Sequence, residues 1–124
     1  MDWKPISKAA VQARIAQAVA RMTTAQLRLW KAIEVEPVKW QQHPYRDQGG
    51  GFWVVAVIGQ TVIWYNDIEE GFNRSTYTIP GAIDEYWCNE DELETAVQYI
   101  ANAVENGQDL VRIGAIYRTT HKTP

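Results

Sequence analysis

Apolar side chains recur every three to four residues near the start of the chain, which is the spacing of one face of a helix. These positions are Val11, Ile15, Ala18 or Val19, and Met22, with Lys, Arg and Gln between them. Ser7 precedes the run as a candidate N-cap, and Thr23 and Gln26 have the spacing of a capping box. The pattern predicts a second helix over residues 25–32, although one continuous helix bent at the threonines fits it as well.

After the helices, the chain changes to residue types that are typical of strands. Residues 33–40 form an extended pattern in which Pro37 indicates an edge strand. Residues 52–58 and 61–68 are rich in Val, Ile and Trp, and the Gly-Gln pair between them suits a two-residue turn. These two segments predict a hairpin within a buried sheet.

Three later segments also have strand-like patterns. Residues 73–79 predict a third antiparallel strand that ends at a Pro-Gly turn, and residues 83–87 predict a short further strand. Residues 110–118 alternate between apolar and polar side chains, as a final strand would. Residues 119–124 are expected to form a disordered tail.

A last helix is predicted between these strands, and the whole order defines the fold class. Asn89 and Glu92 have the spacing of a capping box, and Gly107 is typical of a helix end. Because strands and helices do not alternate regularly, a parallel wound sheet is not expected. We expect one α+β domain over residues 1–124, with an antiparallel sheet of four to five strands and the N-terminal helices and one C-terminal helix packed on one face. Its predicted core contains Trp30, Val55, Val57, Ile63, Leu93, Val97 and Ile100.

Charge is distributed unevenly along the chain, whose net charge is −3. Residues 1–48 hold eight basic and four acidic side chains, whereas residues 49–107 hold ten carboxylates and a single arginine. The acidic part also contains several of the six Trp and six Tyr, which suit interfaces as well as cores. Such segregation can give one surface a potential of one sign, so it favours a binding role, while a solvated polar face is the alternative.

Features of a secreted or membrane protein are not expected from this sequence. Cys88 is the one cysteine, so an internal disulfide cannot form. The first ten residues lack the apolar core of a signal peptide, and no stretch approaches the roughly 20 apolar residues that span a bilayer. We therefore expect a cytoplasmic protein without a membrane partner.

The most informative segment is residues 64–75, which combines aromatic rings, carboxylates and amides. Side chains alternate along a strand, so Trp64 and Asn66 are expected on one face and Tyr65 on the other. We expect Arg74 to pair with a carboxylate such as Asp67, Glu69 or Asp84, and a structural turn or ion pair is the alternative to a recognition surface. The candidate binding residues, expected close together on one surface, are Trp64, Asn66, Asp67, Glu69, Glu70, Asn73, Arg74, Asp84 and Glu85.

The residues do not match a catalytic or metal-binding motif. Counted from Asp67, Gly71 and Thr78 stand at positions that do not fit a calcium-binding loop. Cys88 lies among carboxylates, which disfavour the thiolate that a nucleophile needs. The motifs CxxC, HExxH and GxSxG do not occur. We expect no catalytic residue, no metal and no cofactor, with acid–base catalysis by Asp67, Glu69 or Asp84 as the alternative.

The stretch VIWYNDIEEGFNRS, together with residues 81–86, resembles the central part of small bacterial proteins of the immunity type. An immunity protein blocks a toxin by covering its active surface. The resemblance implies a protein partner, such as a toxin with a basic cleft that attracts an acidic inhibitor. Nucleic acid is not an expected partner because the chain is acidic overall. The remaining alternative is a homo-oligomeric scaffold subunit, such as one that forms a homodimer.

Overall fold

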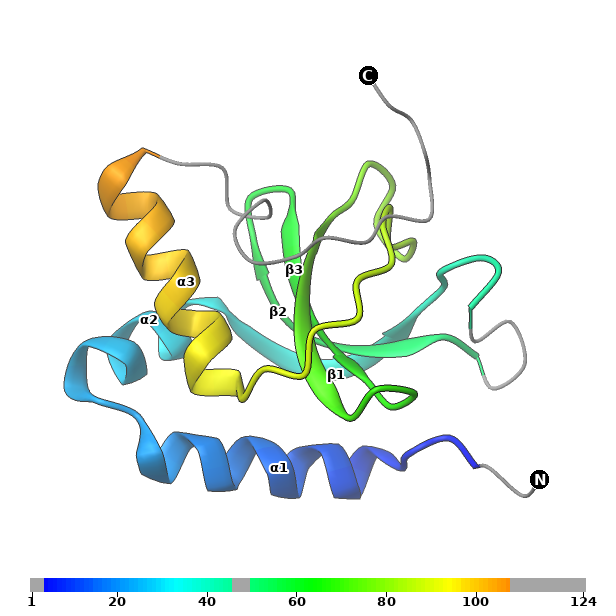
Figure 1. The fold of residues 1–124 in the computed structure, drawn as a ribbon, viewed down its shortest axis with the longest axis horizontal. Coiled ribbons are helices and arrows are strands. Elements are labelled where there is room, and N and C mark those ends of the chain that lie inside the picture. Colours follow the sequence, from blue (N-terminus) through cyan, green and yellow to red (C-terminus); the bar gives the residue numbers. More distant parts are fainter. Residues whose placement is uncertain (1–3, 46–49, 108–124) are drawn as a thin grey trace.

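In the described residues, 4–45 and 50–107 of the 124-residue chain, the computed structural model shows a four-stranded sheet with three helices against one face (Figure 1). The elements are α1 (Lys8–Arg21), α2 (Thr24–Ile33), β1 (Glu34–Trp40), β2 (Phe52–Ile58), β3 (Thr61–Asn66), β4 (Gly71–Thr76) and α3 (Leu93–Asn106). The strands neighbour one another in the order β1-β2-β3-β4, and each pair is antiparallel. The predicted α+β class is confirmed.

The two N-terminal helices begin at the caps that the sequence predicts. The Ser7 hydroxyl accepts a hydrogen bond from the Ala10 N–H at 3.1 Å at the start of α1. At the start of α2, the Thr23 N–H donates to Gln26 Oε1 at 2.9 Å, and the Gln26 N–H donates to Thr23 Oγ1 at 3.1 Å. Met22 between the helices is extended, so the alternative of one continuous bent helix is wrong.

The strands follow the prediction for the hairpin and depart from it at β3 and β4. β1 lies at the edge of the sheet with Pro37 in it, and β2 has the predicted bounds. β3 ends at Asn66, two residues earlier than expected, because Asn66 Oδ1 accepts hydrogen bonds from the Ile68 and Glu69 N–H groups and starts a turn. β4 begins at Gly71 and ends at Thr76, so both ends lie earlier than those of the predicted strand over residues 73–79.

Residues 82–92 lie along the outer edge of β4 and form neither the predicted strand nor the predicted helix start. The expected strand over residues 83–87 is wrong, because side-chain hydrogen bonds replace most of a backbone ladder there. Asn89 does not cap α3, and the N-cap is Glu92. The Asn73 side chain binds both the N–H of Asn89, at 2.8 Å, and its carbonyl, at 3.0 Å, and a capping residue needs that carbonyl for the first helical hydrogen bond. The predicted strand over residues 110–118 and the predicted tail over residues 119–124 lie outside the described residues.

The sheet buries side chains on both faces. Facing the helices is a cluster of buried apolar residues: Val11, Ala18, Trp30, Ile33, Val55, Ala56, Ile63, Tyr65, Phe72, Leu93, Ala96, Val97 and Ile100. Trp40, Phe52, Val54, Val62, Trp64, Ile83 and Tyr86 form a second cluster on the opposite face. The predicted core is confirmed except for Val57, which is only partly buried.

Gly71 is the point of closest approach between the start of β4 and the segment before α3. A Cβ atom added at Gly71 would lie 2.2 Å from Glu90 Cα and 2.8 Å from the Asn89 carbonyl oxygen. Beside it, the Phe72 N–H donates to the Asp91 carbonyl at 2.8 Å. Two segments about twenty positions apart in sequence are therefore held in direct backbone contact.

Replacing Gly71 with Ala is expected to destabilise the protein by about 3 kcal/mol, because backbone atoms cannot move aside as a flexible side chain can. Gly59→Ala is the matched control. Gly59 has φ +57° and nothing within 4 Å of an added Cβ, so it should lose only about 1 kcal/mol from left-handed backbone strain. Urea unfolding of both variants measures the difference, and equal losses would contradict the proposed close contact.

Candidate functional site

Five of the nine predicted binding residues are buried and do not lie on an exposed surface. Trp64, Asn66 and Asn73 have no exposed area, Arg74 is 1% exposed and Glu85 is 6% exposed. Their expected place on a common solvent-facing surface is wrong. The reason is that both faces of the β3–β4 hairpin are covered, by the helices on one side and by residues 82–88 on the other.

The two buried asparagines bind the chain itself. The Asn66 side-chain amide donates to the Tyr86 hydroxyl and to the Trp87 carbonyl, both at 3.0 Å. The Asn73 amide donates to the Asn89 carbonyl at 3.0 Å and accepts from the Asn89 N–H. A buried polar group must be paired to avoid a free-energy cost, and these pairings fix residues 86–89 against the sheet.

Asp84 and Glu85 belong to the other end of β4 and are used there as hydrogen-bond acceptors. Glu85 accepts from the Thr76 N–H at 3.0 Å and also from the Thr76 hydroxyl, while Asp84 accepts from the Thr78 hydroxyl at 3.1 Å. Glu69 and Glu70 precede the start of β4, about 16 Å away for a strand of this length. The expected gathering of Asp84 and Glu85 with Glu69 and Glu70 is therefore wrong.

Arg74 is buried on the helix side of the sheet. Its guanidinium carbon lies 4.7 Å from the centre of the Tyr99 ring, which is a cation–π distance. Burial lowers the pKa of Arg74, and the nearby charge of Asp91 opposes this change. Burial likewise raises the pKa of Asp91, against the influence of Arg74.

The carboxylates that were expected to pair with Arg74 have other positions. Within residues 4–45 and 50–107, no ion pair joins Arg74 to Asp67, Glu69 or Asp84, so that expectation is wrong. Asp67 instead accepts a hydrogen bond from the Ile6 N–H at 2.9 Å, while the Trp53 indole donates to the Ile6 carbonyl at 2.9 Å. Asp67 thus helps to hold the chain before α1 against the sheet.

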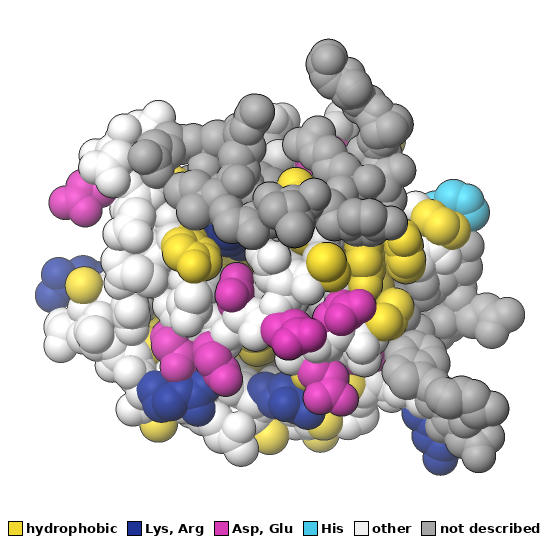
Figure 2. Space-filling model, viewed as in Figure 1, with side chains coloured by type: hydrophobic (Ala, Val, Ile, Leu, Met, Phe, Trp, Pro, Cys, Tyr) yellow, Lys and Arg dark blue, Asp and Glu magenta, His cyan; other side chains and the backbone are white. Residues whose placement is uncertain are grey.

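The fold does gather a different group of carboxylates. Glu70 lines one hollow with Glu90, Asp91 and Glu92, and Glu69 precedes Glu70 in the same β3–β4 turn. The two segments meet because Gly71 and Phe72 contact the backbone of residues 90 and 91. We call these five acidic residues the acidic face. Glu70, Glu90 and Glu92 are exposed, and the other two are half-buried. Figure 2 shows acidic side chains gathered in the lower half of the view, with Lys and Arg side chains directly below them.

The acidic face carries an aliphatic side chain where indole rings were expected. Trp30, Trp40, Trp64 and Trp87 are buried, and Trp53 is half-buried. Ile68, in the same turn as Glu69 and Glu70, is 44% exposed. The aromatic residues of the acidic segment thus belong mainly to the core, and the exposed apolar group next to the carboxylates is Ile68.

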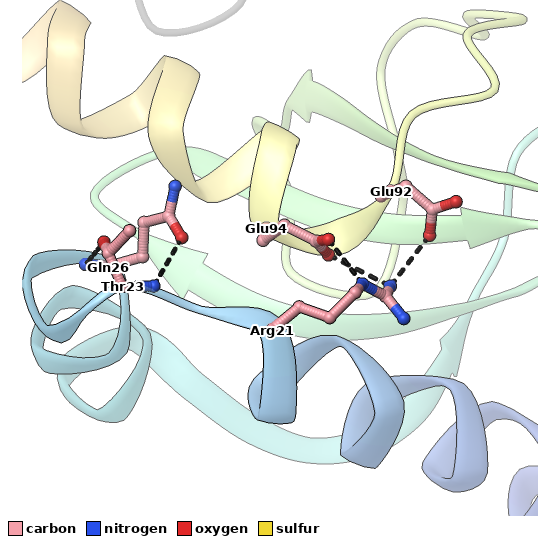
Figure 3. A network of polar contacts seen from close by, with 5 residues as sticks. All are labelled: Arg21, Thr23, Gln26, Glu92 and Glu94. Atoms are coloured by element: carbon pink, nitrogen blue, oxygen red, sulfur yellow. Dashed lines mark hydrogen bonds and ion pairs between the residues drawn. The ribbon is translucent and has the colours of Figure 1, made fainter.

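The helix α1 supplies arginines along the border of the acidic face. Arg21 lies between Glu92 and Glu94, with Nη2 to Glu92 Oε1 at 2.9 Å and Nε to Glu94 Oε2 at 2.6 Å (Figure 3). These contacts join α1 to the start of α3. Partial burial tends to raise the pKa of Glu94, but the hydrogen bond and charge of Arg21 and a backbone hydrogen bond lower it below the ordinary value.

Two hollows lined by residues of the described ranges do not bring the predicted acid–base residues together. One, of about 340 Å³, lies between α1 and β1 and contains Glu34 and Glu36 as its carboxylates. Glu36 is ion-paired with Lys8 at 2.7 Å. Asp67, Glu69 and Asp84 do not line this hollow. Within the described ranges, there is also no cluster of three His, Cys, Asp or Glu side chains that could hold a metal.

Comparisons with protein-family models, curated proteins and solved structures found no match for this chain. In the part of the chain that the structure describes, no helix combines the length and apolar character needed to cross a membrane. The arguments for function therefore come from the acidic face and its surroundings.

The Arg21–Glu94 contact predicts a defined pH dependence of stability. Because the pKa of Glu94 is lowered by folding, its contribution is present above the unfolded value of about 4.3 and is lost as pH falls through the folded value. Glu94→Gln should therefore melt below the wild type at pH 7, and the two melting temperatures should converge near pH 3. Glu105→Gln, on the exposed last turn of α3, is the control and should follow the wild type throughout. A constant difference at all pH values would contradict the assignment.

Proposed function

We propose that this chain is a non-enzymatic protein-binding module that uses its acidic face to bind a basic surface on a partner, in the manner of an immunity-type inhibitor. The observation that carries the proposal is the gathering of Glu69, Glu70, Glu90, Asp91 and Glu92 from two separate segments. The partner would present Lys and Arg side chains, as a toxin with a basic cleft does.

The two segments that carry the acidic face are held in fixed positions, which favours a recognition surface over a mobile charged loop. The β3–β4 turn is fixed by the Asn66 side chain, whose Oδ1 accepts hydrogen bonds from two turn N–H groups. Residues 90 and 91 are fixed by their contact with Gly71 and Phe72. A preorganised surface loses less conformational entropy when a partner binds, so more of the interaction energy contributes to affinity.

The charges of the acidic face would attract a basic partner, and Ile68 would contact that partner after it has bound. Charges of one sign on a surface steer an oppositely charged partner and raise the association rate, and salt screens this effect. Exposed Ile68 beside Glu69 and Glu70 can then bury apolar area at the same contact. Glu92 contributes less to the attraction because Arg21 already pairs with it.

The two alternatives have less support from the geometry. An enzyme that uses Asp67, Glu69 or Asp84 needs a hollow that contains them, and these residues line neither the hollow between α1 and β1 nor the smaller one beside Tyr65. A homo-oligomeric scaffold subunit needs a large apolar patch. The described residues expose four large apolar side chains, those of Val38, Ile68, Ile79 and Val104, and bury the others at least in part.

The double variant Glu70→Lys/Glu90→Lys is expected to weaken partner binding at least tenfold, because it reverses two exposed charges of the acidic face. The control is Glu34→Lys/Glu105→Lys, which makes the same change in net charge at exposed positions outside that face. The partner is isolated from cells of the source organism with the wild-type protein as bait, and binding rates are then measured at several salt concentrations.

The proposal predicts slower association with the acidic-face variant, a steep loss of the wild-type rate with added salt, and a control that behaves as wild type. Melting temperatures should remain close to that of the wild type, since both substituted side chains are exposed. Equal loss in both double variants would show a general effect of net charge and would reject the acidic face as the binding surface.

A further inference from the structure

A small cavity lies between α1 and the acidic face. Its volume is about 80 Å³, and among its lining residues are Arg14, Gln17, Tyr65, Glu70, Glu90 and Asp91. At about 30 Å³ per water molecule, this space matches the charged end of one side chain and excludes larger ligands such as nucleotides. The cavity therefore fits a small polar group that can form hydrogen bonds with its lining residues.

The Tyr65 hydroxyl is an independent indication that this cavity takes a ligand. Tyr65 is 2% exposed, and its hydroxyl oxygen is buried without a hydrogen-bond partner among the residues that the structure describes. Tyr65 is itself one of the residues that line the cavity, together with Arg14 and Glu70. A buried hydroxyl without a partner costs free energy, and a ligand that supplies one recovers it.

The phenol keeps its proton at neutral pH. Burial raises the pKa of Tyr65, Arg14 lowers it, and the carboxylates of Glu70, Asp67 and Glu92 raise it further. The Arg14 guanidinium carbon lies over the ring, 5.2 Å from its centre, so this cation contacts the ring face. The neutral hydroxyl at the ring edge can accept a hydrogen bond from an N–H donor.

The charges around the cavity favour a cation. Four carboxylates and two guanidinium groups line it. One of these guanidinium groups, that of Arg21, is already paired with Glu92 and Glu94 (Figure 3). Asp91 is also influenced by the buried charge of Arg74. Glu70 and Glu90 then outnumber Arg14, and a hydrogen bond from a cationic donor to a carboxylate is stronger than one between neutral groups. An anion would meet this excess of negative charge.

We propose that this cavity takes the charged end of a basic side chain, an ammonium or a guanidinium group, that a partner protein presents to the acidic face. The cation would donate hydrogen bonds to the Tyr65 hydroxyl and to the carboxylates of Glu70 and Glu90. The inference rests on the proposed function and adds to it a specific anchor point, because a buried charged side chain at the centre of an interface contributes more than its exposed neighbours.

The full chain is titrated with N-acetyl-arginine amide and N-acetyl-lysine amide, and the Gly71 amide and Tyr65 ring signals are followed by NMR. Saturable shifts are expected with at least one of the two probes. The uncharged isostere N-acetyl-citrulline amide and inorganic phosphate should produce none. Equal response to citrulline or to phosphate, or no saturable shift with either cation, would overturn the proposal.

The variant Tyr65→Phe tests the hydroxyl directly. It should bind the cationic probe about tenfold more weakly, while its melting temperature equals or exceeds that of the wild type because an unpaired buried hydroxyl has been removed. Tyr77→Phe is the matched control, since the Tyr77 hydroxyl donates to the Gly59 carbonyl at 2.9 Å and does not line the cavity. Unchanged affinity in Tyr65→Phe would overturn the role of the hydroxyl.

The two proposals fail in distinguishable ways. If Glu70→Lys/Glu90→Lys abolishes partner binding but the wild type binds no cationic probe, the cavity inference is wrong and the proposed function stands. If the probes bind as expected but charge reversal leaves partner binding intact, the acidic face is not the interface. The occupant of the cavity would then be a free small cation, and the assignment to a partner would be overturned.

Discussion

The pairing of two buried asparagine side chains with a segment of irregular backbone is the constraint on which the rest of the structure depends. Asn66 and Asn73 stand on the same face of the β3–β4 hairpin and hold the backbone of residues 87 and 89. That segment covers the second buried cluster, on the face of the sheet opposite the helices, and leads directly to the carboxylates before α3. The same contacts therefore complete the core and set the position of the acidic face.

Local signals in the sequence were sufficient for the elements that local interactions determine. Ser7 and Thr23 cap helices through hydrogen bonds that reach three residues along the chain, so their spacing identified both helix starts. Asn89 has an equally good local pattern, but its N–H is used by Asn73, sixteen residues earlier. The two long-range hydrogen bonds to Asn73 thus hold Asn89 outside α3, which begins at Leu93, and no local pattern could have indicated them.

The candidate site was only partly predictable for a related reason. Alternation along β3 correctly separated Trp64 from Tyr65, yet it gave no sign that both faces would be covered. A covering segment without regular structure has no periodicity from which burial can be inferred. Glu69 and Glu70 were identified as candidates, whereas Glu90 was assigned to a helix start. Its place near the β3–β4 turn could not be predicted, because the contact at Gly71 joins positions distant in sequence.

The covering of β4 also limits how another protein can join this sheet. At its two ends, the Phe72 N–H donates to the Asp91 carbonyl, and the Thr76 carbonyl accepts from the Asp84 N–H. β1, at the other edge, contains Pro37 and an irregular register against β2, both of which oppose the pairing of an added strand. Association by extension of the sheet is thus disfavoured at either margin, and the molecule is suited to partners that engage side chains and leave its backbone ladder unaltered.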